Sequence, residues 1–133
     1  MQNNIILVDD DESIAEGIKH FLEKNNYSVS VFENGQKAFS EIIRREGTEQ
    51  FNFLITDFLM PQMNGLELVK KLKENCICIP TVVISSKRRA DLLVSFKDLE
   101  VLEIFEKPFE LKILSNFISE ILSKDREACT CKS

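Results

Sequence analysis

The sequence lacks the segments that take a chain into or across a membrane. Its longest apolar runs are only a few residues, whereas a membrane-spanning helix needs roughly 20. The first four residues, MQNN, have neither the basic start nor the apolar stretch of a secretory signal peptide. We therefore expect a cytoplasmic protein that has no membrane partner.

The sequence also lacks an excess of positive charge. It has 17 Lys and Arg residues against 22 Asp and Glu residues, which gives a formal net charge of -5 at pH 7. Sequence-independent binding of nucleic acid depends on Lys and Arg side chains that neutralise phosphates. A direct nucleic-acid partner is therefore not expected.

Residues that commonly bind zinc are few. There is one His, and the four cysteines form two Cys-x-Cys pairs, whereas zinc sites more often place two residues between paired cysteines. Because no secretory signal is seen, we expect Cys76 and Cys78 to be reduced thiols. Cys129 and Cys131 fall in a polar tail, where disulfides would be adventitious.

What is present is the composition of an ordinary globular domain. The chain has 133 residues, 44% of them hydrophobic and 29% charged, which is enough to bury one core. We predict one domain over residues 1–124 and a polar C-terminal tail over residues 125–133.

Strand-like segments alternate with helical patterns along this domain. Two of the strand segments alternate with polar residues or are interrupted, which is typical of edge strands: residues 27–31 and 101–105. The others are apolar throughout, as strands buried on both faces are: residues 5–8, 53–55 and 81–84. Apolar residues at helical spacing follow each strand, within residues 14–22, 38–43, 66–72, 92–96 and 110–124. The predicted buried anchors of the fourth helix are Leu92, Leu93 and Phe96.

Five such alternations predict an α/β fold with a parallel sheet. Right-handed crossovers and the strand order 2-1-3-4-5 leave the two polar strands at the edges, which describes a doubly wound (βα)5 flavodoxin-like fold. In this order the chain reverses direction at the first and third strands. The crevice at that point collects polar residues from the strand ends.

Carboxylates, a hydroxyl and an ammonium group follow four of the strands. Asp9 and Asp10 come after the first, Asp57 after the third, Ser85 after the fourth and Lys107 after the fifth. Carboxylates 4 Å apart repel each other by about 4 kcal/mol per pair at an effective dielectric of 20, so a cation is expected among them. Oxygen ligands without His or Cys favour Mg²⁺ (or Mn²⁺), and Mg²⁺ often binds carboxylates together with a phosphate.

Each of these residues also has a simpler explanation when it is taken alone. The acidic run at residues 9–11 can cap the following helix, Ser85 can be a strand-end hydrogen bonder, and Lys107 with Pro108 can form a turn. However, four separate strands bring acid, acid, hydroxyl and ammonium to one edge of one sheet. This coincidence favours a site for phosphoryl groups.

The chain to about Lys124 resembles the receiver domain of bacterial two-component response regulators, including the stand-alone chemotaxis-type receivers. Four motifs carry the resemblance: Asp9-Asp10 after ILV, Asp57 followed by FLMPQMNG, Ser85 five residues after Pro80, and Lys107-Pro108-Phe109. The combination is specific, although any one of these motifs alone is a weak signal.

The resemblance implies a role in a phosphorelay for each site residue. Asp57 would accept a phosphoryl group from the phosphohistidine of a histidine kinase or phosphotransfer protein, or from a small phosphodonor. Lys107 would stabilise charge on the phosphoryl oxygens, and Ser85 would hydrogen-bond them after transfer. The ligands of Mg²⁺ would be Asp9, Asp10, Asp57 and the backbone carbonyl of Leu59. The protein would be a switch rather than an enzyme, because it would catalyse only its own phosphorylation and dephosphorylation.

The resemblance also implies a way for the switch to work. In the family the counterpart of Ser85 moves toward the phosphoryl group, and an aromatic ring three residues before the lysine turns inward. Ile104 occupies that position here, so the switch at Ser85 and Ile104 departs from ring rotation, and repacking of Ile104 is the alternative. Output would pass through the face of the fourth helix, fifth strand and fifth helix, to a downstream protein target or a homodimer.

Two other functions are compatible with parts of the pattern. A degenerate receiver that docks to proteins without being phosphorylated would tolerate Ile104, but it would not need Asp10, Asp57, Ser85 and Lys107 together. A metal-dependent phosphatase would need a general acid or a mobile cap, and neither is recognisable in the sequence.

Overall fold

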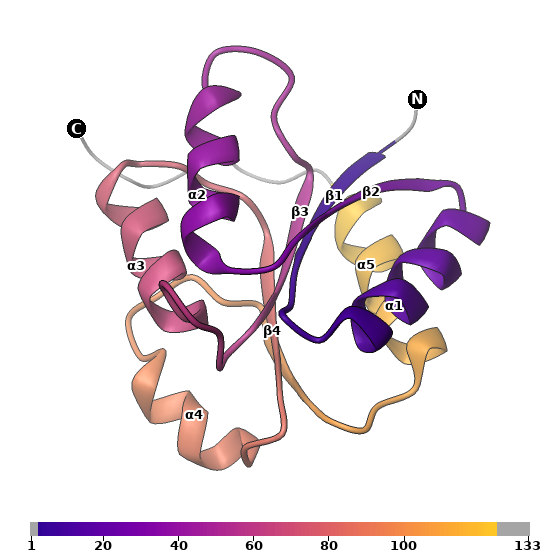
Figure 1. The fold of residues 1–133 in the computed structure, drawn as a ribbon. Coiled ribbons are helices and arrows are strands. Elements are labelled where there is room, and N and C mark those ends of the chain that lie inside the picture. The colour runs from indigo at the N-terminus through magenta and orange to yellow at the C-terminus, as the bar shows by residue number, and fades with distance from the viewer. Residues whose placement is uncertain (1–2, 125–133) are drawn as a thin grey trace.

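Five parallel strands form one sheet in the order β2-β1-β3-β4-β5 in the computed structural model, which describes residues 3–124 (Figure 1). The strands are β1 (Asn3–Val8), β2 (Tyr27–Phe32), β3 (Phe53–Asp57), β4 (Thr81–Ser85) and β5 (Glu103–Glu106). The helices are α1 (Glu12–Lys24), α2 (Gly35–Arg44), α3 (Gly65–Glu74), α4 (Arg89–Ser95) and α5 (Leu111–Leu122). The predicted doubly wound α/β fold and its strand order are confirmed. No helix within residues 3–124 has the length and apolar character to cross a membrane.

The sheet lies between two layers of helices. α1 and α5 cover one face, and α2, α3 and α4 cover the other (Figure 1). Alternate residues of the central strands feed the two layers: Ile5, Leu7 and Ile55 pack toward α1 and α5, whereas Ile6, Val8 and Leu54 pack toward α2 and α3. All residues of β3 and β4 are buried, as the continuous apolar runs predict.

The outer strands are more exposed, as their polar pattern predicts. Val29 is the only buried residue of β2, and Ile104 is the only buried residue of β5. On β5, Ile104 faces a small cluster that joins the sheet to α3 and α4. That cluster contains Val69, Val83, Leu92 and Phe96.

Side chains cap the first three helices at their N-termini. Asp11 accepts hydrogen bonds from the amides of Ser13 and Ile14 of α1, so the expected capping by an aspartate is confirmed. Asn34 caps α2 by accepting from the amide of Lys37. At α3, Asn64 and Glu67 exchange side-chain and backbone hydrogen bonds in a capping box.

Two details of the sequence prediction are wrong. Leu93 is 45% exposed and does not anchor α4, because this helix buries only the stripe that carries Leu92, which Phe96 continues just beyond the helix. The last strand begins at Glu103 rather than at Val101, because the Val101 amide donates to Leu99 in a turn before the strand pairs with β4.

The prediction for the first cysteine pair is also wrong. Cys76 and Cys78 each take part in a disulfide in the structure, and both residues are exposed. The expectation of reduced thiols rested on the cellular compartment, which says nothing about which sulfur atoms lie within bonding distance. The predicted polar tail, with Cys129 and Cys131, lies outside the described residues.

Candidate functional site

The carboxyl ends of four strands meet at one edge of the sheet. Asp9 follows β1 directly, Asp57 ends β3, Ser85 ends β4 and Lys107 follows β5 directly. The pairing register keeps these ends level, with three neighbouring pairs: Val8 with Thr56, Asp57 with Ile84, and Ser85 with Glu106. Residues far apart in the sequence are therefore brought to one place.

Lys107 reaches across this edge to two carboxylates. Its Nζ lies 3.2 Å from Oδ2 of Asp57 and 3.5 Å from Oδ2 of Asp9. The Lys107 side chain is 18% exposed, and those of Asp57 and Asp9 are 10% and 0% exposed. Because water screens these charges little, each pair interacts more strongly than an ion pair on the surface would. The predicted juxtaposition of Asp9, Asp57 and Lys107 is present.

Asp10 completes a group of three carboxylates. One oxygen from each of Asp9, Asp10 and Asp57 lies within 4.8 Å of the other two. Asp9 is further fixed by the Asp11 amide, which donates to its Oδ1 at 2.9 Å, while Asp10 is exposed to solvent. Hard oxygen donors with an open side fit Mg²⁺, which binds through one or two carboxylates and keeps several waters.

The charges in this group act on one another. Burial raises the pKa of the Asp57 carboxyl to about 6, and the charge of Asp9 adds to the rise, while Lys107 opposes it. Burial alone would lower the pKa of Lys107, but the charges of Asp57 and Asp9 outweigh it, so the net pKa of Lys107 is raised. Lys107 therefore stays protonated, and it only partly offsets the rise in the pKa of Asp57 that burial and Asp9 cause together.

Ser85 lies at the end of β4 with its side chain almost fully buried. Its Oγ accepts a hydrogen bond of 3.0 Å from the Lys87 amide, and its carbonyl oxygen accepts one of 2.7 Å from the Lys107 amide. The residue that was expected to bind a phosphoryl group is thus hydrogen-bonded to both loops that flank the site.

The loop after Asp57 ends at Gly65, the first residue of α3, and the sequence did not reveal why this position needs a glycine. Gly65 does not serve here by adopting a positive φ angle, because the positive φ angles between Asp57 and α3 belong to Gln62 and Met63. A Cβ on Gly65 would instead lie 2.5 Å from the carbonyl oxygen of Asp57. Gly65 is therefore required because α3 begins against the backbone of Asp57. Leu59, in the same loop, is half exposed.

Ile104 is 3% exposed and packs beneath α4 in the cluster with Val83, Leu92 and Phe96. It lies in β5 three residues before Lys107 and takes no part in the polar site. The role of Ile104 as a switch residue stays a prediction.

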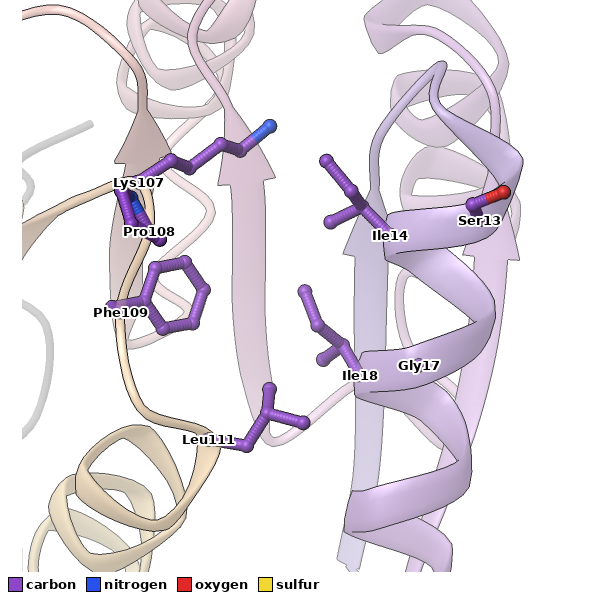
Figure 2. A pocket seen from close by; sticks show the side chains of 8 residues that line it. All are labelled: Ser13, Ile14, Gly17, Ile18, Lys107, Pro108, Phe109 and Leu111. Carbon is purple, nitrogen blue, oxygen red and sulfur yellow. The ribbon is translucent and has the colours of Figure 1, made fainter.

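A pocket of about 510 Å³ opens beside Lys107, between α1 and the segment after β5. Ile14 and Ile18 of α1 point into it from one side, and Phe109 and Leu111 from the other (Figure 2). The Lys107 side chain extends away from this apolar lining (Figure 2). The polar site thus has an apolar neighbour on the α1 side.

Comparison with known proteins gives a consistent result. The family model described as response regulator receiver domain matches residues 5–119. The response regulator receiver protein CpdR of Brucella abortus is 30% identical over 118 residues, covering 89% of this chain and 95% of CpdR. The transcriptional regulatory protein CrdR of Helicobacter pylori is 32% identical over 126 residues, covering 94% of this chain and 57% of CrdR.

The fold comparison points the same way. The receiver domain of Francisella response regulator 1452 superposes with a TM-score of 0.81 at 24% identity, covering 92% of this chain and 98% of that one. At this identity the likeness supports the fold alone. The chain spans about half the length of several curated relatives, among them CrdR and the PhoP protein of Bacillus subtilis.

Proposed function

Because the chain belongs to the response regulator receiver domain family, we propose that it is a phosphoacceptor switch of a two-component phosphorelay, with Asp57 as the acceptor. One observation supports this most directly. Lys107 lies within 3.5 Å of both Asp57 and Asp9, at the point where Asp10 brings a third carboxylate. Such an arrangement supports the proposal, because a cation and a candidate metal site lie beside the carboxylate that would act as the nucleophile.

In this mechanism Asp57 is the nucleophile. At pH 7 its carboxyl is mainly ionised, since its pKa is about 6. A carboxylate oxygen attacks the phosphorus of a phosphohistidine, the new O–P bond forms, and the P–N bond breaks. The electron pair of that bond leaves with the imidazole of the donor.

The other residues position and stabilise charge, which is most of what phosphoryl transfer requires of a protein. Lys107 donates hydrogen bonds to the phosphoryl oxygens, and Ser85 does so after transfer. Mg²⁺ held by Asp9, Asp10, Asp57 and the Leu59 carbonyl would neutralise charge that develops on those oxygens. A water that attacks the phosphoaspartate would end the signal, so the protein acts only on its own Asp57.

The donor would be a histidine kinase or a phosphotransfer protein. The pocket lined by Ile14, Ile18 and Phe109 offers such a protein apolar surface next to Lys107. The output would be a change in binding of a downstream protein, or of a second copy, at the face of α4, β5 and α5. Several relatives are named as transcriptional regulators, but direct binding of nucleic acid is not part of this proposal.

The test is the intact mass of the protein after incubation with acetyl phosphate and Mg²⁺, with Asp57→Asn and EDTA as controls. We expect the mass of one added phosphoryl group in the unmodified protein, and no gain in either control. A gain that persists in Asp57→Asn would contradict the assignment of the acceptor.

One observation supports a second candidate, a docking module that works without phosphorylation. Ile104 is buried at the position where the family carries an aromatic ring, so the ring rotation is not available here. If Mg²⁺ binds but no phosphoryl group is gained from acetyl phosphate or from histidine kinases, the docking module becomes the better account.

A further inference from the structure

Helix α4 begins without a capping side chain of its own. Arg88 occupies the N-cap position, but its side chain makes no capping hydrogen bond to the backbone amides of the first turn, and its guanidinium pairs with the Asp91 carboxylate instead. The Arg89 amide donates to Oε1 of Glu106 on β5 at 2.5 Å. A neighbouring strand thus supplies the acceptor for one of the first-turn amides, which have no partner within the helix.

The side chain of Arg89 makes a second bond to the same strand. Its Nε lies 2.7 Å from Oε1 of Glu103, which also accepts the Ile104 amide at 2.9 Å. Both carboxylates of β5 therefore hold the first residue of α4. We call Arg89, Glu103 and Glu106 the α4 clamp.

The α4 clamp is connected to the acceptor through β5. Glu106 directly precedes Lys107, whose Nζ binds Asp57. A shift of the Lys107 backbone moves Glu106 with it, because they share a peptide bond. The clamp is one residue from the lysine that would meet a phosphoryl group.

A second connection runs through β4. Ser85 Oγ accepts from the Lys87 amide, and Lys87 is two residues before Arg89. If Ser85 turned toward a phosphoryl group, the Lys87 amide would lose its acceptor and the segment leading to Arg89 would shift. Both routes from the acceptor therefore end at the hydrogen bond between Glu106 and the Arg89 amide.

We propose that the α4 clamp is the output lever of this receiver: phosphorylation of Asp57 breaks the bond from the Arg89 amide to Glu106 and releases the N-terminus of α4. The inference rests on the proposed function and names its regulation. A phosphoryl group adds roughly 1.5 to 2 negative charges and three acceptor oxygens, which draw Lys107 and Ser85 toward it. A short hydrogen bond weakens steeply when its ends separate, and α4 has no local cap to replace it.

In this receiver the α4 clamp would do what the rotating aromatic ring does in the family, which is to pass the change at the acceptor to α4. Ile104 is already buried against Leu92 and Phe96, so its side chain has no outward position from which to rotate. The polar contacts of the clamp lie on the exposed rim of the same helix, where they can break without opening the apolar cluster.

The test is hydrogen exchange at the amides of residues 89–95, with and without acetyl phosphate and Mg²⁺. Variants are Glu106→Ala, Glu106→Gln, and Glu16→Ala on the exposed side of α1 as the matched control. Loss of a cap typically changes the equilibrium constant for opening of a helix by a factor of about five to ten. We therefore expect the amide exchange rates of residues 89–95 in the unmodified protein to rise by that factor on phosphorylation.

The variants separate the clamp from other causes. Glu106→Ala should show the faster exchange before phosphorylation and little further change after it. Glu106→Gln keeps an oxygen acceptor and should retain part of the response, while Glu16→Ala should behave as the unmodified protein. Equal responses to phosphorylation in Glu106→Ala and in the unmodified protein would overturn the lever.

The intact mass of the same samples distinguishes failure of the lever from failure of the proposed phosphoacceptor function. A protein that gains a phosphoryl group without any change at residues 89–95 would contradict the lever alone. A protein that gains none would contradict the proposed function, and the lever with it.

Discussion

Asp57 is a residue whose charge opposes folding when no metal is bound. Its pKa rises from the ordinary 3.8 to about 6 because of burial first and the charge of Asp9 second. The folded protein thus holds the proton more tightly than the unfolded chain does. This group therefore destabilises the folded state above pH 6, and the destabilisation is relieved as the pH falls from about 6 to about 4.

Asp57→Asn should accordingly be more stable than the unmodified protein in EDTA at pH 7. A rise in pKa from 3.8 to about 6 corresponds to a gain of at most about 3 kcal/mol, which urea unfolding can measure. The difference should shrink toward zero near pH 4. If the variant is less stable at pH 7, the ion pair between Asp57 and Lys107 outweighs the cost of burying the carboxylate, and the predicted sign of the stability change is wrong.

Alanine substitutions at Gly65 and Gly17 should change the stability of the protein in opposite directions. A Cβ on Gly65 would meet the Asp57 carbonyl at 2.5 Å, whereas a Cβ on Gly17 of α1 would meet nothing within 4 Å. Gly17→Ala should stabilise the protein by about 0.5–1 kcal/mol, because alanine favours the helix interior. Gly65→Ala should destabilise it by about 1–3 kcal/mol, through overpacking. Thermal unfolding of the two variants side by side decides this, and similar effects would contradict the close contact.

At the scale of elements, the capping box of α3 fixes where the helix begins. Asn64→Ala removes the acceptor of the Glu67 amide and should lower the free energy of unfolding by about 1 kcal/mol. Lys70→Ala, on the exposed face of the same helix, should change it by less than about 0.5 kcal/mol. If denaturant midpoints for the two variants coincide, α3 does not depend on this cap.

Element types followed from the sequence, and their exact limits did not. Continuous apolar runs identified β1, β3 and β4 because these strands are buried on both faces. The sequence could not show which of Leu92 and Leu93 is buried, because α4 has only seven residues and its buried side depends on where Ile104 lies. Glu103 was an interruption in the sequence, and only the structure reveals that it binds Arg89 of α4.

At the scale of the whole molecule, magnesium and folding should be linked. A ligand that binds only the folded state stabilises it by about 2.7 kcal/mol at 100 times its dissociation constant. We expect Mg²⁺ to raise the unfolding temperature of the unmodified protein. Asp10→Asn should largely lose this increase while keeping the stability measured in EDTA, because Asp10 is exposed and makes no ion pair among residues 3–124. An undiminished increase in the variant would contradict the proposed ligand set.

The meeting of Asp9, Asp57 and Lys107 could be predicted because parallel strands of known order bring their carboxyl ends together. The contacts of the α4 clamp could not, since they depend on the rotamers of two glutamates that look like ordinary surface residues in the sequence. The steric demand at Gly65 was hidden for a similar reason, because a glycine in a loop usually indicates a turn.

Because β5 lies at the edge of the sheet, the site is complete only when this last strand is paired. Asp9 and Asp57 belong to adjacent inner strands, but Lys107 is delivered by a strand of four residues that pairs only with β4. If β5 separates from β4, Lys107 moves away with it, whereas Asp9 and Asp57 remain on strands that are still paired. Under the proposed function, such a molecule would keep the carboxylates that could hold Mg²⁺ but would lack the ammonium group needed for phosphoryl transfer, so phosphorylation would require β5 to be paired.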